Sequence, residues 1–301
     1  MQKEKVLVIL GPTSSGKTAL SIELAKKYNG EIVSADSRQV YRGMNLGTGK
    51  VTAHEMQNIS HHMLDVADPK KVYSVSDYVL GARRCIDDIH SRGKLPIICG
   101  GTAFYIDAVL GKTQLPDVPP NPTLRKKLGQ KSAPELFDML TELDPIRAKN
   151  IDQHNPVRLV RSIEIAKALG KVPPLKKTDS PYEVLQIGLD MPDEILKGRI
   201  TLRLTERLKT GMLEEGRALH QKGLSFRRMR QLGLEYGAMA DLLTSKVSRG
   251  AFEITLANDI WQYAKRQRVW WKRDKTIVWF DSSKKSTLQK SASLVRKFTT
   301  S

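Results

Sequence analysis

The sequence is poor in cysteine, in aromatic residues and in long apolar stretches, and these shortages exclude several classes of protein. Two cysteines among 301 residues cannot build a disulfide framework or a four-thiolate zinc site. We expect Cys85 and Cys99, each in an apolar stretch, to be reduced core residues. The apolar run at residues 6–10 is too short to cross a bilayer, and nothing around it is typical of a signal peptide. We therefore expect a cytoplasmic protein with no membrane partner.

Acidic residues are the scarcer charge. The chain has 50 Lys and Arg against 32 Asp and Glu, a formal net charge of +18. Residues 1–116 carry a net charge of +4 and residues 117–301 a net charge of +14. Such an excess is typical of a surface that binds a polyanion, although charge alone fits a solvated basic surface equally well.

Short apolar runs alternate with helical patterns, which predicts an α/β fold with a P-loop NTPase-like, doubly wound parallel sheet. Strands are expected at residues 6–10, 32–35, 61–66, 95–99, 184–190 and 276–280. Helices are expected at residues 18–28, 75–92, 157–169, 193–223 and 252–272. The Ser- and Lys-rich tail from Ser282 is expected to be loosely ordered.

Prolines interrupt this alternation twice. Residues 116–122 contain four of them, and Pro173 and Pro174 form a second break. The sequence therefore predicts three parts: residues 1–116 as the first part of the catalytic core, residues 117–181 as a small helical insertion, and residues 182–301 as the return to the core.

One motif predicts a phosphate site. It has the pattern G-x-x-x-x-G-K-T between a predicted strand and a predicted helix, and consists of Gly11, Pro12, Thr13, Ser14, Ser15, Gly16, Lys17 and Thr18. Its glycines let backbone N–H groups converge on an anion, Lys17 adds a positive charge, and Thr18 offers a hydroxyl ligand for Mg²⁺. The motif alone leaves open whether a nucleoside triphosphate or a diphosphate leaving group is held.

Two further features can serve such a site. Asp36 ends the second predicted strand, at the sheet edge where open α/β folds place their chemistry, and can accept a proton or cap a turn. Arg199, Arg203 and Arg207 share one helix face because they are four residues apart. They can neutralise a polyphosphate or form a solvated stripe, and both interpretations stay open.

A basic helix is predicted near the C-terminus, with an apolar face formed by Ala257, Trp261 and Ala264. Its cations are Lys265, Arg266, Arg268, Lys272 and Arg273. Such a helix can present positive charge to a phosphate backbone. The adjacent Trp270 and Trp271 can stack on bases, but a tryptophan pair at this spacing is more often core.

Several sequence blocks occur in the order and spacing of one known family: residues 11–18, 36–41, 47–50, 61–66 with 68–69, 100–102 and 264–267. Taken together, they resemble the tRNA dimethylallyltransferases along almost the whole chain. The resemblance implies that dimethylallyl diphosphate is the donor. It implies that the acceptor is the N6 amine of an adenine adjacent to the anticodon of tRNA, flipped out of its loop.

The resemblance also implies residue roles. Asp36 would remove the N6 proton, Arg203 would stabilise the departing diphosphate, Thr102 would contact substrate, and residues 11–18 would hold the diphosphate with Mg²⁺, Thr18 being the metal ligand. The positions implied to contact tRNA are Asp36, Ser37, Arg38, Gln39, Thr102, Arg125, Arg158, Arg161, Lys265, Arg266 and Arg268. The insertion and the C-terminal helices would bind the anticodon loop, and we expect a monomer.

Three positions depart from the family pattern, namely Val51, Val157 and Leu234. We expect Val51 to be neutral, whereas Val157 and Leu234 leave open the details of tRNA contact and therefore which tRNAs are modified. Three alternatives also remain: a P-loop small-molecule kinase, which would consume ATP without RNA, an RNA-binding module whose phosphate loop is only a switch, and a transferase acting on free adenine nucleotides. The basic excess beyond residue 116 disfavours the last.

Overall fold

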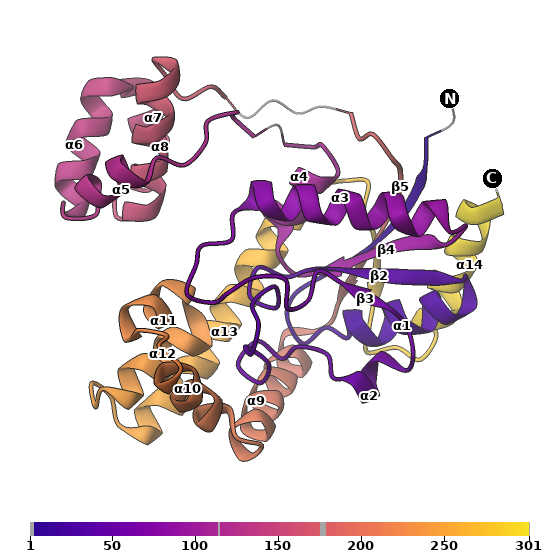
Figure 1. Ribbon diagram of the computed structural model, residues 1–301. Coiled ribbons are helices and arrows are strands. Elements are labelled where there is room, and N and C mark those ends of the chain that lie inside the picture. Colours follow the sequence, from indigo (N-terminus) through magenta and orange to yellow (C-terminus); the bar gives the residue numbers. More distant parts are fainter. Residues whose placement is uncertain (1–2, 114, 175–178, 301) are drawn as a thin grey trace. The chain divides into compact units, whose positions relative to one another are not determined.

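Six parallel strands form one sheet in the computed structural model, which describes residues 3–113, 115–174 and 179–300. The strand order is β3-β2-β4-β1-β5-β6, and Figure 1 labels β3, β2, β4 and β5 of this sheet. The strands are β1 (Lys5–Leu10), β2 (Gly30–Ala35), β3 (His61–His62), β4 (Leu95–Gly100), β5 (Glu183–Asp190) and β6 (Val278–Asp281). Every pairing in the sheet is parallel, as the alternating pattern predicts.

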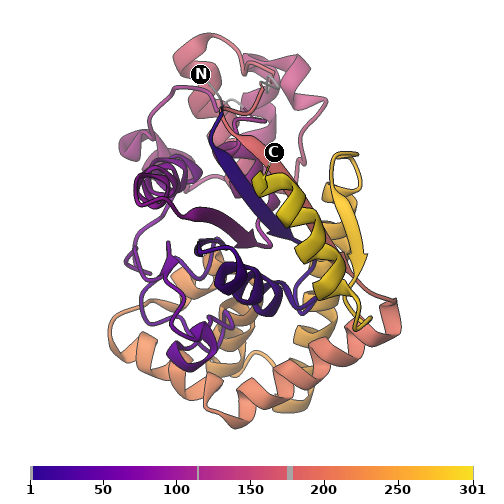
Figure 2. The same cartoon turned by 90° about the vertical axis from the view of Figure 1, so that its right-hand side faces the viewer.

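Helices cover both faces of the sheet. Side chains of β1 alternate between the faces, so Val8 and Leu10 join a core that includes helices α3 (Val75–Ser91) and α4 (Ala103–Val109). Leu7 and Ile9 join the opposite core, against α1 (Lys17–Lys27) and α14 (Thr287–Thr300), two helices that lie side by side in Figures 1 and 2. The predicted doubly wound architecture is confirmed.

The predictions for β3 and for the C-terminal tail are wrong. Strand β3 spans only His61 and His62 rather than residues 61–66, because Met63 and Asp65 adopt left-handed backbone angles, with φ of 63° and 56°, that end a strand. The tail from Ser282 is not loose: α14 buries Ala292 and Val295 against the sheet. Its apolar positions recur at helical spacing within a polar sequence, which composition alone conceals.

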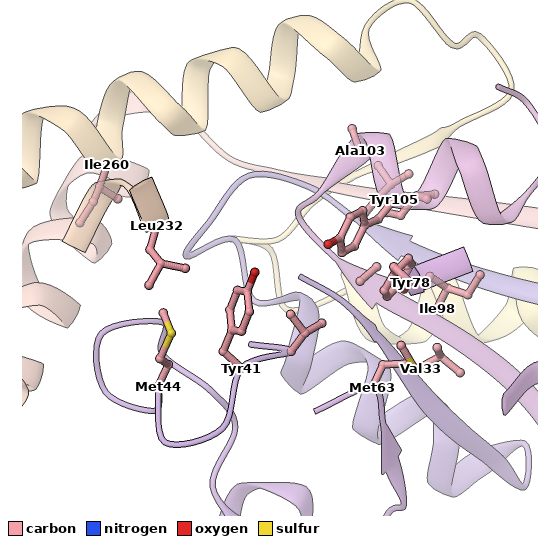
Figure 3. Close-up of a cluster of buried hydrophobic side chains, with 14 of the residues drawn as sticks. Val33, Tyr41, Met44, Met63, Tyr78, Ile98, Ala103, Tyr105, Leu232 and Ile260 are labelled. Atoms are coloured by element: carbon pink, nitrogen blue, oxygen red, sulfur yellow. The ribbon is translucent and has the colours of Figure 1, made fainter. Parts of the chain in front are cut away.

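A group of helices after β5 packs on the same core as α3 and α4. The pattern at residues 193–223 is two helices, since Gly211 breaks it with a φ of 103°. The helices are α9 (Asp193–Lys209), α10 (Met212–Gln221), α11 (Phe226–Leu232), α12 (Leu234–Leu243) and α13 (Arg249–Trp271). Figure 3 shows Leu232 and Ile260 from this group near Tyr41 and Met44 in that core.

Residues 112–178 form a separate compact unit, and the rest of the chain forms the other. The smaller unit contains α5 (Pro122–Leu128), α6 (Ala133–Leu143), α7 (Pro145–Ala148) and α8 (Pro156–Leu169). Helix α8 agrees with the helix predicted at residues 157–169 to within one residue, with Asn155 as cap, Pro156 in the first turn and Gly170 left-handed at the end. Residues 175–178 of the predicted insertion lie outside the described residues. Among the described helices, including the short α2 (Ala53–Met56), none could span a membrane.

Candidate active site

The phosphate loop connects β1 to α1 at the carboxyl edge of the sheet. Gly11, Ser14 and Gly16 have φ values of 149°, 63° and 89°, and Gly16 caps the N-terminus of α1. A Cβ at Gly11 would overlap the carbonyl oxygen of Leu189 in β5. The loop therefore needs its first glycine for close packing and its second for the turn into the helix.

Lys17 is the central cation of this loop. Its Nζ donates a 2.7 Å hydrogen bond to the carbonyl oxygen of Pro12. Burial, together with the positive charge of Arg203, lowers the pKa of Lys17 to about 8. The Ser15 hydroxyl, also in the loop, is buried and has no hydrogen-bond partner within the described part of the chain. A desolvated cation in this loop favours the binding of an anion.

Two cavities meet at the loop. One has a volume of about 550 Å³ and also borders Arg199 and the helix α2, whereas the other, of about 170 Å³, also borders the segment after β2 and the helices α12 and α13. Five residues line both: Ser14, Lys17, Thr18, Gly49 and Arg203. A diphosphate held by this shared set would face both cavities.

Asp36 lies in the smaller cavity with Lys17 and Arg203. Its Oδ1 accepts hydrogen bonds from the backbone N–H groups of Arg38, at 2.8 Å, and Gln39, at 3.3 Å. The carboxylate therefore stabilises a turn, as one interpretation predicts, and it also borders the cavity, so its role as a proton acceptor stays a prediction. Ser37, Arg38 and Gln39 line the same cavity, as predicted from their place in the motif.

The arginine row on α9 faces the site. Arg203 donates a 2.9 Å hydrogen bond to the carbonyl oxygen of Gly49, and Arg207 lies 3.6 Å from the carboxylate of Glu235. Burial lowers the pKa of Arg203 to about 10, so it stays charged at neutral pH. The exposed Arg199 borders the larger cavity. Arg203 and Arg207 are therefore not part of a solvated stripe, whereas Arg199 is exposed at the edge of the larger cavity.

Helix α13 supplies side chains that the sequence analysis did not assign. Gln267 accepts a 2.9 Å hydrogen bond from the Thr13 N–H and donates one of 2.7 Å to the carbonyl oxygen of Gly101. Tyr263 hydrogen-bonds to Thr102, and burial raises the pKa of Tyr263 to about 12. The only sequence signal for these α13 side chains was the block at residues 264–267, which includes Gln267 but gives it no role.

Glu235 on α12 is a second unassigned group in the smaller cavity. Burial raises the pKa of its carboxyl, although the charge of Arg207 opposes this shift. The Cys99 thiol borders the same cavity, and burial raises its pKa too. Cys85 and Cys99 are both free, as predicted.

Arg268 does not present a free cation, in contrast to the sequence-based expectation. It donates to Asp190 Oδ1 at 2.8 Å and to Asp193 Oδ1 at 2.5 Å, and its side chain is 11% exposed. Lys265 and Arg266, by contrast, are exposed. The tryptophan pair divides: Trp271 is core, whereas Trp270 donates to Asp107 and is 39% exposed.

Two of the three cations predicted in the smaller unit have an internal partner. Arg125 and Arg161 both pair with the buried carboxylate of Glu164, at 2.7 and 3.2 Å. Arg158 is exposed. Contact of these three residues with tRNA stays a prediction.

The residues around the loop fit a magnesium ion carried by the substrate. Mg²⁺ in phosphate sites needs few protein ligands, because phosphate oxygens and water complete its shell. Thr18 borders both cavities and Asp36 borders the smaller one, whereas Asp65 instead pairs with Lys50 at 2.6 Å. The described residues contain no cluster of three or more His, Cys, Asp or Glu that would hold a metal unaided.

Comparisons with known proteins agree with one another. The family model described as IPP transferase matches residues 39–274, and that of Isopentenyl transferase matches residues 4–72. The tRNA dimethylallyltransferase of Halalkalibacterium halodurans is 37% identical over 93% of this chain and 91% of its own length. The enzyme of that name from Bacillus mycoides is 41% identical, with the same coverage.

Solved structures give the same result. A full-length tRNA isopentenylpyrophosphate transferase from Bacillus halodurans superposes with a TM-score of 0.75 at 35% identity, covering 98% of this chain and 96% of that one. A eukaryotic dimethylallyltransferase described as acting on tRNA superposes with a TM-score of 0.84 at 26% identity, covering 99% and 80%.

Proposed function

The chain belongs to the IPP transferase family and transfers a prenyl group to tRNA, and we propose how the residues described above perform this reaction. The donor is dimethylallyl diphosphate and the acceptor is the N6 amine of an adenine adjacent to the anticodon. The observation that carries the proposal is the smaller cavity, in which Lys17, Arg203 and Asp36 meet. It brings cations for a leaving diphosphate together with a base for the incoming amine.

In the reaction, the lone pair of N6 attacks the first carbon of the dimethylallyl group. The carbon–oxygen bond to the diphosphate breaks, and the diphosphate leaves with the bonding electrons. The N6 proton passes to the carboxylate of Asp36. The products are N6-dimethylallyladenosine in tRNA and diphosphate. The reaction therefore consumes neither water nor a nucleoside triphosphate.

The donor is held by the residues that line both cavities. Lys17 and Arg203 neutralise the charge that grows on the diphosphate as the bond breaks, and each such contact typically contributes about 2–4 kcal/mol to the transition state. Thr18 would be the protein ligand of Mg²⁺, which when bound supplies further neutralisation of the diphosphate charge.

The acceptor base enters the smaller cavity, which Ser37, Arg38, Gln39 and Tyr263 also line. A base within a stacked anticodon loop cannot reach Asp36, so it must be turned out of the stack. The exposed Lys265 and Arg266 would contact the tRNA phosphates. The proposal includes action as a monomer in the cytoplasm.

The direct test uses purified protein, unmodified tRNA and isotope-labelled dimethylallyl diphosphate. Label should enter tRNA, and nuclease digestion with mass spectrometry should place it on the adenine adjacent to the anticodon. Addition of ATP should change nothing. ATP consumption without RNA, or label transfer to free adenosine monophosphate at the same rate as to tRNA, would overturn the proposal.

A further inference from the structure

One side chain joins the phosphate loop to the segment that follows β4. Gln267 is 5% exposed, and both ends of its amide are used: Oε1 accepts from the Thr13 N–H at 2.9 Å, and Nε2 donates to the Gly101 carbonyl oxygen at 2.7 Å. A buried amide with both ends satisfied is held in one orientation. Gln267 therefore fixes the distance between these two backbone segments.

The two segments belong to the parts of the site proposed for different substrates. Thr13 belongs to the loop that continues to Lys17, on the donor side. Gly101 precedes Thr102, whose Oγ1 accepts a 3.0 Å hydrogen bond from the N–H of Ser37, next to Asp36. Gln267 thus connects the phosphate loop with the segment of Asp36: one hydrogen bond reaches the loop, and two in succession, to Gly101 and from Ser37 to Thr102, reach that segment.

The space for this amide depends on a glycine. A Cβ at Gly101 would overlap Gln267 Nε2, whereas the next nearest atoms lie 3.7 Å and 3.9 Å away. Gly101 does not have a left-handed backbone angle, in contrast to Gly11 and Gly16. Its lack of a side chain therefore serves the Gln267 contact rather than the backbone conformation.

From this arrangement we propose that Gln267 is a positioning residue, which holds the phosphate loop in register with the Asp36 segment so that donor and acceptor meet. The part of the inference that concerns the tRNA base and Asp36 rests on the proposed function. The part that concerns the phosphate loop requires only that the loop binds a diphosphate. We call the two hydrogen bonds of Gln267, with Thr13 and Gly101, the clamp. Loss of the clamp should weaken diphosphate binding and turnover. It should leave tRNA binding unchanged, because the exposed cations of α13 do not depend on it.

Three variants and a control test the clamp. Gln267→Leu removes both hydrogen bonds at similar volume, Gly101→Ala displaces the amide from the other side, and Gln267→Glu keeps the acceptor but replaces the donor. Gln262→Leu, on the exposed face of the same helix, is the control. Calorimetry with inorganic diphosphate should give about tenfold weaker binding for Gln267→Leu and Gly101→Ala, and no change for Gln262→Leu.

A pH series distinguishes positioning from mere loss of structure. In Gln267→Glu the carboxylate faces the Gly101 carbonyl oxygen, and protonation restores a donor there. The wild type and the variant share the other charged or titratable groups that line the cavity, which are Lys17, Asp36, Arg38, Cys99, Arg203, Glu235 and Tyr263. Their titration largely cancels in the ratio of variant to wild-type turnover. That ratio should rise about tenfold from about pH 8 to about pH 6 for Gln267→Glu and stay flat for Gln267→Leu.

The outcomes are separable. Diphosphate affinity of Gln267→Leu equal to that of the wild type, or parallel pH profiles for the Glu and Leu variants, would overturn the clamp. Diphosphate binding that depends on Gln267 in a protein without prenyl transfer would keep the clamp and reject the proposed function. A melting temperature measured for each variant identifies a protein that has failed to fold, and Gly101→Ala then provides the second route to the same result.

Discussion

The guanidinium of Arg203 donates a hydrogen bond to the carbonyl oxygen of Gly49, a residue with a left-handed φ of 58°. A Cβ at Gly49 would overlap the guanidinium groups of both Arg203 and Arg207. The loop before it is held by Glu215, whose carboxylate accepts from the N–H groups of residues 45, 46 and 47. The loop therefore sets how closely the arginines approach the phosphate loop.

Gly49→Ala should weaken donor binding. The added methyl group displaces both arginines and strains the backbone, so we expect the dissociation constant of dimethylallyl diphosphate to rise about tenfold or more. Calorimetry with the donor measures this, and filter binding of tRNA, which should not change, is the control. Unaltered donor affinity would show that Arg203 acts independently of this loop.

Asp36→Asn should abolish turnover without releasing tRNA. The amide can still accept the hydrogen bonds from Arg38 and Gln39, so the turn is retained, but it cannot take the N6 proton. Loss of a general base typically reduces the rate about 10²–10⁴-fold. Single-turnover transfer of labelled donor measures the rate, and retained turnover would remove Asp36 from the mechanism.

Donor affinity should depend on the titration of Lys17. Burial lowers its pKa to about 8 in the free protein, so the ammonium that attracts diphosphate is present below that pH and is lost above it. Affinity should therefore fall as pH rises from about 7 to about 9, with a limiting slope of about tenfold per pH unit. In Lys17→Arg the slope should vanish because arginine does not titrate there. An equal slope in both proteins would contradict this assignment.

The cations of α13 should separate into two kinds. The double variant Lys265→Ala with Arg266→Ala should weaken tRNA binding. The slope of the logarithm of the binding constant against the logarithm of the salt concentration should fall by the amount expected for the loss of about two phosphate contacts. Arg268→Ala should instead lower the melting temperature and leave the salt dependence unchanged, because it removes the partner of Asp190 and Asp193. Titration of tRNA at several salt concentrations, with thermal unfolding in parallel, distinguishes the two effects.

Local signals in the sequence were sufficient for the phosphate loop and Asp36. In both cases the residues that act together are adjacent in the chain, and a buried strand precedes them, so their place at the sheet edge follows from the pattern. The doubly wound fold was predictable for the same reason, because each strand and helix has its own periodicity.

Long-range partners were not predictable. The role of Gln267 depends on contacts with Thr13 and Gly101, and that of Arg268 on Asp190 and Asp193, which lie far away in the sequence. A basic or amide side chain on a helix has the same local pattern whether it is solvated or buried against such a partner. The early end of β3 was missed because the left-handed backbone angles at Met63 and Asp65 do not affect the hydropathy pattern of the sequence.

Strand β1, which leads into the phosphate loop, has one neighbour from each half of the chain: it pairs with β4 and with β5, where Lys5 lies opposite Glu183. Gly11 in turn packs on Leu189. During synthesis on a ribosome, the nascent N-terminal half thus carries the complete glycine-lysine motif beside an open sheet edge. A polypeptide that terminates before β5 contains every residue of the motif and lacks the wall against which it folds.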